Sequence, residues 1–123
     1  MYYSILIHSA EGVFDRLPSE EQAAIFQGHR DLQAALAERG PYTTVKLMPT
    51  SHAVTLKPTS EPHQKPMVID GPFAETKERF LGLYIAEFES LDEAISFAEM
   101  ISAPFVSLEI RPVAWAGGNL GEG

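Results

Sequence analysis

The 123-residue sequence contains no cysteine, few basic residues and no long hydrophobic run. Without cysteine the chain can form neither a disulfide framework nor a thiolate-based active site, which fits a reducing compartment. Nine lysines and arginines stand against seventeen aspartates and glutamates, and the resulting formal net charge of −8 disfavours direct binding to nucleic acid. The apolar opening run, Tyr2–His8, has no basic start and is too short for a signal peptide or a membrane span. We therefore expect a cytoplasmic protein without direct contacts to nucleic acid or membrane.

Several signatures of catalysis and cofactor binding are also missing from the sequence. It has no glycine-rich phosphate loop, no dinucleotide fingerprint and no Gly-x-Ser-x-Gly elbow. His8 and His29 could share a metal ion with a carboxylate, but no pair of residues has a recognised ligand spacing. We expect no metal site and no cofactor.

The length and composition fit one globular domain. Apolar residues make up 45% of the chain and charged residues 21%, which is enough for one hydrophobic core. We expect this domain to occupy residues 1–116 and a flexible, glycine-rich tail to follow at residues 117–123.

Residue patterns predict several strands and two helices. β-Branched and aromatic residues alternate in the predicted strands, which are Tyr2–His8, Tyr42–Met48, Ala53–Lys57, Pro66–Asp70, Phe80–Phe88 and Phe105–Pro112. Capping boxes at Ser19–Gln22 and Ser90–Glu93 predict where the two helices begin. The first helix is expected to bury Ile25, His29, Leu32 and Leu36, and to end at Gly40–Pro41. The second is expected to bury Leu91, Ala94, Ile95, Ala98 and Ile101.

The order of these elements predicts an α+β fold of the ferredoxin-like, split βαβ type, with an antiparallel sheet and both helices on one face. The other face is expected to carry Ser4, Leu6, His8, Ser107, Glu109 and Arg111. Because its central strand, Phe80–Phe88, is apolar on both sides, we expect a second copy of the chain to cover this face as a homodimer. A cleft between the two sheets is then the natural place for a ligand.

A family resemblance runs through most of the chain. The run Asp70–Glu78, which reads Asp-Gly-Pro-Phe-Ala-Glu-Thr-Lys-Glu, resembles the signature of the DGPF group of YCII-related proteins. Leu83–Ile85, Ser90–Ala94 and Glu109–Val113 match that family in kind, order and spacing, and Pro49–Ser51 and Gly40 fit as well.

The resemblance implies a ferredoxin-like fold in the dimeric α/β-barrel superfamily, with a biochemical function that is poorly known. It also implies a dimer cleft in which a histidine approaches an aspartate, the basis for suspecting enzyme activity in the family. Relatives in the DGPF group are linked with extracytoplasmic sigma factors, which implies a possible protein partner of that class.

His29 and Asp70 are the candidate catalytic pair. His29 lies on the apolar stripe of the first helix, so it is either an acid–base group or a partly buried histidine satisfied by one hydrogen bond. A catalytic histidine needs a nearby carboxylate to orient its ring, and Asp70 is the candidate. Asp70 has its own structural explanation, since aspartate before glycine favours a tight turn.

His8 and Arg111 are the candidate ligand contacts on the face without helices. The planar guanidinium of Arg111 could hold a substrate carboxylate or phosphate, or it could form a structural ion pair with Glu87 or Glu109. Two functions therefore remain open. The first is a small-molecule site in the dimer cleft, enzymatic or not. The second is a non-catalytic regulatory module that binds a protein such as a sigma factor.

Overall fold

A computed structural model describes residues 1–74 and 77–121. Glu75 and Thr76 of the DGPF-like signature, and Glu122 and Gly123 of the expected tail, lie outside the described residues. The strands are β1 (Tyr2–Ser9), β2 (Thr43–Lys46), β3 (Val54–Lys57), β4 (Met67–Asp70), β5 (Arg79–Glu87) and β6 (Val106–Pro112). The helices are α1 (Val13–Arg16), α2 (Ser19–Arg39), α3 (Leu91–Ala98) and α4 (Gly118–Gly121), with 3-10 turns η1 (Thr50–His52) and η2 (Glu99–Ile101).

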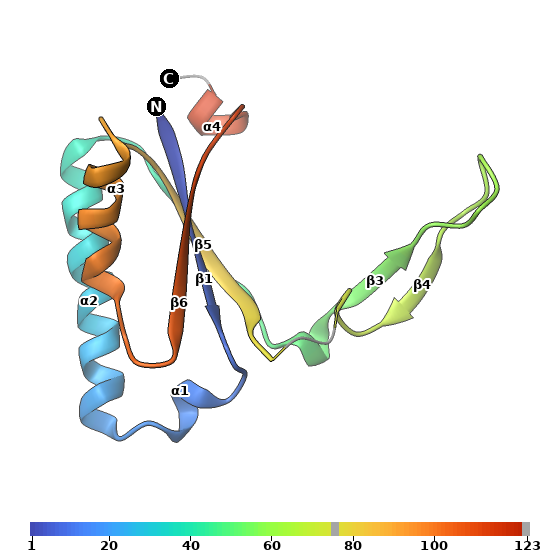
Figure 1. Cartoon of the computed structure of the whole chain (residues 1–123), viewed down its shortest axis with the longest axis horizontal. Helices are drawn as coiled ribbons and strands as arrows, with labels where there is room; N and C mark the ends of the chain where they lie inside the picture. Colours follow the sequence, from blue (N-terminus) through green and yellow to red (C-terminus); the bar gives the residue numbers. More distant parts are fainter. Residues whose placement is uncertain (75–76, 122–123) are drawn as a thin grey trace.

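Four of the strands form an antiparallel sheet in the order β2-β5-β1-β6, which confirms the predicted ferredoxin-like fold. β1 lies in the centre and pairs with β5 on one side and with β6 on the other. The two long helices, α2 and α3, cover the same face of this sheet (Figure 1). Neither long helix covers the opposite face, which we therefore call the helix-free face; the short helix α4 approaches it beside Tyr2, at the start of β1.

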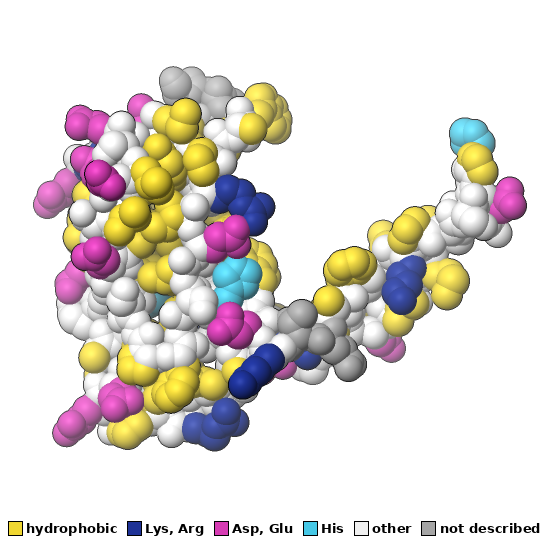
Figure 2. All heavy atoms as spheres, in the orientation of Figure 1, with side chains coloured by type: hydrophobic (Ala, Val, Ile, Leu, Met, Phe, Trp, Pro, Cys, Tyr) yellow, Lys and Arg dark blue, Asp and Glu magenta, His cyan; other side chains and the backbone are white. Residues whose placement is uncertain are grey.

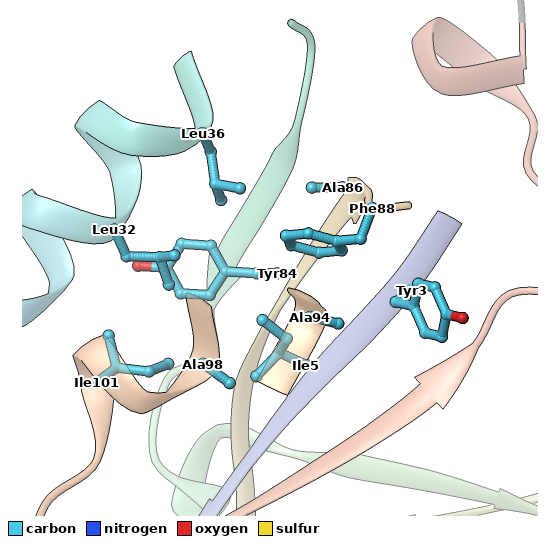
Figure 3. Packing of buried hydrophobic residues seen from close by; sticks show 10 residues of the cluster. All are labelled: Tyr3, Ile5, Leu32, Leu36, Tyr84, Ala86, Phe88, Ala94, Ala98 and Ile101. Atoms are coloured by element: carbon cyan, nitrogen blue, oxygen red, sulfur yellow. The ribbon is translucent and has the colours of Figure 1, made fainter. Parts of the chain in front are cut away.

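The hydrophobic core fills the space between the sheet and the two helices (Figure 3). Alternate residues of β1 and β5 point into it, as the period of two in a strand requires. Helix α2 contributes Leu32 and Leu36, which are almost fully buried. The core consists of Tyr3, Ile5, Leu32, Leu36, Tyr84, Ala86, Phe88, Ala94, Ala98 and Ile101.

The start of α2 differs from the prediction. The capping box expected at Ser19–Gln22 is wrong, because Ser19 is already helical and its side chain caps nothing. The carbonyl of Pro18 accepts the N–H groups of Glu21 and Gln22, and the side chain of Gln22 donates to the carbonyl of Phe14 at 2.9 Å. Phe14 belongs to the short helix α1, which was not among the two predicted helices. That extra turn offers Gln22 an acceptor outside its own helix.

The second predicted cap is confirmed. Ser90 accepts the N–H of Glu93 at 3.1 Å, and α3 buries Ala94 and Ala98. Leu91 and Ile95 were expected on the same buried stripe, but they stay 48% and 38% exposed. Small alanines already fill the narrow contact between α3 and the sheet. At the other end of the chain, within the expected tail, α4 buries Leu120, whose carbonyl accepts the hydroxyl of Tyr2 at 3.3 Å.

The remaining strands, β3 and β4, form a separate two-stranded antiparallel sheet. This hairpin projects from the body of the protein on the side away from α2 and α3 (Figure 1). We call residues 53–74 the arm. The loop at its tip, between Lys57 and Met67, contains the three prolines that predicted an exposed loop.

Candidate functional site

The four predicted site residues occupy three different places in one chain. His29 lies on α2, on the helix-covered side of the sheet. His8 and Arg111 lie on the helix-free face, because Leu6 and Glu109 are paired there while Ile5 and Ile110 point into the core. Asp70 ends β4 in the arm. The sheet therefore separates His29 from His8 and Arg111 within one chain.

His29 is bonded to a tyrosine of the central sheet. Its Nδ1 lies 2.7 Å from the hydroxyl oxygen of Tyr84, and the two rings stack with centroids 5.7 Å apart and an interplanar angle of 21°. The side-chain amide of Gln33, one turn further along α2, donates to the same hydroxyl at 3.1 Å. Tyr84 itself is only 2% exposed, so its hydroxyl depends on these two partners.

These bonds and the burial of the ring together favour one protonation state of His29. The Tyr84 hydroxyl accepts from Gln33, and its own proton needs an acceptor, which the Nδ1 of a neutral His29 provides. Burial, and then the positive charge of Lys46, hold the pKa of His29 below its ordinary value. The low pKa favours a neutral imidazole, and the tautomer with its proton on Nε2 is the one that lets Nδ1 accept the Tyr84 hydroxyl. Within the described residues, Nε2 makes no hydrogen bond and is not sealed from solvent.

The sequence could have suggested this partnership. Tyr84 falls on the strand face with Ala86 and Phe88, and a tyrosine buried there needs a hydrogen-bond partner. Gln33 lies four residues after His29, so both side chains share one face of α2. The structural explanation for His29 was a partly buried histidine satisfied by one hydrogen bond, and the group that makes this bond is the phenol of Tyr84.

The helix-free face carries a second polar group, formed by His8, Glu109 and Arg111. We call these three residues the open-face cluster. The Nε2 of His8 lies 3.6 Å from one oxygen of Glu109, and the other oxygen of Glu109 accepts from both Nε and a terminal nitrogen of Arg111. The ion pair expected as one explanation of Arg111 is thus present. The hydrogen bond from Arg111, with smaller contributions that include the charge on Arg111 and the presence of His8, keeps the pKa of Glu109 below its ordinary value.

His8 is the unusual member of this cluster. Its Nε2 is buried yet has no hydrogen-bond partner within the described chain, since Glu109 lies beyond hydrogen-bond distance. The ring is held by β1 and by contact with Phe80, whose ring centroid is 5.6 Å away. Next to it on the face, the hydroxyl of Ser107 donates to Glu78 at 3.2 Å. This nitrogen lacks a hydrogen bond that a small movement of His8 or Glu109 would supply, and it is shielded from solvent in the single chain.

Asp70 stands apart from both histidines. It is exposed, and within residues 1–74 and 77–121 its side chain makes no hydrogen bond or ion pair. The turn that follows it is held by other groups. Gly71 has a φ of 105°, its N–H donates to Ala53, and its carbonyl accepts the hydroxyl of Thr55. The glycine therefore plays the turn role that the sequence predicted, while Asp70 keeps its carboxylate free.

The structure also contains a hollow of about 350 Å³, which lies elsewhere. It is at the N-terminal end of β1, between Met1, Arg39 and Phe88, and includes none of the four predicted site residues. Within the described ranges no group of three or more histidine, aspartate or glutamate side chains could hold a metal ion. No helix in the same ranges is long and apolar enough to cross a membrane.

The antiparallel sheet with two helices on one face and a polar cluster on the other defines a ferredoxin-like α+β domain. A family model for the YCII-related domain matches residues 1–114. An uncharacterised protein of Rhizobium meliloti (strain 1021) is 36% identical over 118 residues, which cover 93% of each chain. The chain belongs to the YCII-related family, as the motifs in its sequence predicted.

Proposed function

We propose that the protein is a homodimer in which the helix-free faces of two chains enclose a binding site for a small carboxylate-bearing molecule. The observation that carries this proposal is the buried, unpartnered Nε2 of His8 beside the Glu109–Arg111 ion pair. Because this nitrogen is shielded in the single chain, the His8 ring would have to turn toward the ligand before a polar group of the ligand could complete its hydrogen bonding.

The chemistry of Arg111 favours an anionic ligand. The side chain contacts Glu109 through Nε and one terminal nitrogen, and its other terminal nitrogen makes no contact within the described residues. The free edge of a guanidinium can hold a carboxylate through two parallel hydrogen bonds. Glu109 would then neutralise part of the positive charge and keep Arg111 in position.

The shape of the face supports the dimer. The half-buried Leu6, Leu83 and Ile85 form its centre, and Val45 and Phe80 at its margins are 47% and 40% exposed. Apolar side chains in the middle of a sheet face, with polar ones towards one edge, are typical of a surface covered by another polypeptide. A second copy packed against this face would bury the apolar centre and close the open-face cluster in a cleft.

Acid–base catalysis at His29 is a second candidate function, favoured by the neutral imidazole and its accessible Nε2. Tyr84 would position the ring and leave the Nε2 N–H free to donate a hydrogen bond to a substrate. Transfer of the Nε2 proton to the substrate would require Nδ1 to take up the hydroxyl proton of Tyr84 in the same step, so that the imidazole stays neutral. Pairing of His29 with Asp70 would need an arm from another chain to reach the helix-covered side of the sheet, because Asp70 lies on the projecting arm. The dimer proposed above joins the helix-free faces and does not supply that contact.

Calorimetric titration with a panel of small mono- and dicarboxylates tests the binding site. We expect one carboxylate to bind the native protein and to lose at least about tenfold in affinity in Arg111→Leu, which removes a charge-assisted contact. Arg30→Leu, an exposed arginine on α2, is the matched control and should bind normally. No binding by any carboxylate, or equal binding by both variants, would contradict the proposed site. Light scattering on the native protein tests the dimer separately.

A further inference from the structure

Most of the large apolar side chains of the arm are exposed to solvent in the single chain. Val54, Leu56 and Val68 are 62%, 61% and 67% exposed, and Met67 and Phe73 are 57% and 83% exposed. Figure 2 shows hydrophobic side chains along the arm, with the body of the chain leaving them uncovered. A two-stranded sheet by itself is marginally stable, and apolar patches of this kind mark surfaces that another polypeptide covers.

One face of the arm is especially apolar. Leu56 pairs with Val68 across the two strands, and Val54 pairs with Asp70, so these four side chains point to the same side. Thr55 and Ile69 point to the other side, where both are half-buried. We call the side with Val54, Leu56 and Val68 the apolar arm face.

The root of the arm is fixed to the body. The N–H of Leu47 donates to Leu81 at 2.8 Å, and the N–H of Thr50 donates to the carboxylate of Glu11 at 2.7 Å. Arg79, the first residue of β5, donates to the carbonyl of Ala74 at 2.7 Å. These bonds fix the segments that enter and leave the arm. The arm projects from the body, and the angle between the two stays open (Figure 2).

We propose that the arm of each chain packs against the other chain of the homodimer, with the apolar arm face on the partner's four-stranded sheet. This inference rests on the proposed homodimer and assigns the surface that holds it together. Three observations favour a second copy as the occupant: the continuity of the apolar surface, the charge of the arm and the open angle beside it.

The apolar surface of the arm continues into the helix-free face that the dimer would bury. Leu47 and Met48, 45% and 68% exposed, connect Val45 of β2 with the arm. Phe80 lies near the start of β5, where the chain returns from the arm. Charged and histidine side chains line the side of the body that faces the arm (Figure 2). A second chain in the open angle would therefore meet both surfaces at once.

Charge favours the same occupant. The arm's two lysines, Lys57 and Lys65, are balanced by Glu61 and Asp70, so the net charge of −8 lies on the rest of the chain. A neutral, apolar arm can approach a strongly acidic copy of the same protein without the repulsion that two acidic bodies would feel. Asp70 lies opposite Val54 on the arm, so the docked arm would place the carboxylate of Asp70 against the partner chain.

The first experiment uses the double variant Leu56→Ser/Val68→Ser in the full chain. Because both side chains are exposed in one chain, the fold should survive, and we expect the dimer dissociation constant to rise at least about tenfold. Leu91→Ser, at an exposed position of α3 on the helix side, is the matched control and should leave the dissociation constant unchanged.

The second experiment uses the absence of cysteine in the chain. A benzophenone attached to Ser60→Cys at the arm tip, in a mixture of unlabelled and nitrogen-15-labelled protein, should cross-link to the sheet of the other chain. The same probe on Ala34→Cys, exposed on α2, should give no cross-link between chains.

The two experiments separate this inference from the dimer on which it rests. A native protein that light scattering finds monomeric would overturn both proposals. A stable dimer whose dissociation constant is unchanged in Leu56→Ser/Val68→Ser, or whose arm probe reacts only within its own chain, would overturn the arm proposal and leave the dimer standing.

Discussion

The hydroxyl oxygen of Tyr84 lies 2.7 Å from Nδ1 of His29 and joins the central sheet to helix α2 through a polar contact beside the apolar core. Gln33 completes the arrangement by donating to the same oxygen. The contact satisfies a tyrosine that is almost fully buried, and it selects the neutral form of the histidine. The behaviour of this pair can be measured whether or not His29 takes part in a reaction.

The pKa of His29 should lie below its ordinary value of 6.5 when followed by NMR titration. The unfolded chain then binds the proton more readily than the native chain, so the free energy of unfolding should fall as the pH drops below about 6.5 and recover above it. His29→Gln should remove this part of the pH dependence, while His52→Gln, at an exposed position, should retain it. Identical pH profiles for the two variants would contradict the assignment.

Removal of the Tyr84 hydroxyl should destabilise the protein. In Tyr84→Phe the ring still fills the core, but Nδ1 of His29 and the amide of Gln33 lose their partner, which costs about 1–3 kcal/mol for buried polar groups. The pKa of His29 should rise, because the neutral form loses its hydrogen bond. Tyr42→Phe is the control, since the hydroxyl of Tyr42 makes no hydrogen bond in the described residues. Urea unfolding and NMR titration measure the two effects.

The sequence predicted the fold well because the four-stranded sheet and its helices follow simple periodicities. β1 alternates core residues such as Tyr3 and Ile5 with residues of the helix-free face, and α2 places Leu32 and Leu36 four residues apart on its buried side. The cap at Ser90 was predictable because its partner, Glu93, lies three residues away. Local patterns of this kind are visible without the tertiary structure.

The site was harder to predict because its contacts join distant parts of the chain. His29 and Tyr84 are 55 residues apart, and which of the polar groups in the chain meets His29 depends on the register of β5 under α2. The separation of His29 from His8 depends on which sheet face each occupies. The projection of the arm depends on the bonds at its root, such as that between Glu11 and Thr50, and no periodicity in the sequence encodes them.

Gly28→Ala should destabilise the protein although alanine favours helices. Gly28 lies inside α2, where alanine ordinarily adds about 0.5–1 kcal/mol of stability over glycine. A Cβ atom at this position would lie 2.4 Å from the carbonyl oxygen of Met100, and backbone atoms cannot yield as a flexible side chain can. We expect a net loss of about 1–3 kcal/mol as α2 and η2 are forced apart.

The matched measurement for this prediction is Ala34→Gly at an exposed position of the same helix, which should cost about 0.5–1 kcal/mol. Both variants would then be less stable than the native chain, although they exchange the same two residues in opposite directions. A gain of stability in Gly28→Ala by thermal or urea unfolding would show that α2 and η2 are less closely packed than the structure indicates.

Phe105→Gly should stabilise the single chain. Phe105 has a φ of 66°, in the left-handed region that favours glycine, and it follows Pro104 in a turn closed by the bond from the N–H of Val106 to the carbonyl of Ala103. Its side chain is 73% exposed, so little packing is lost on its removal. The carbonyl of Phe105 accepts the hydroxyl of the buried Ser9 at 2.8 Å and holds the turn in place, so the strain cannot relax by rotation of the peptide.

We expect Phe105→Gly to raise the free energy of unfolding by about 1 kcal/mol, the order of the penalty for an L-residue in this conformation. Phe105→Ala keeps the strained backbone and should bring no gain, which separates relief of strain from loss of an exposed aromatic ring. Urea unfolding measured at protein concentrations low enough to exclude self-association gives the comparison. If glycine brings no more stability than alanine, the turn stores no strain, and the exposed ring must be explained by a contact outside the single chain.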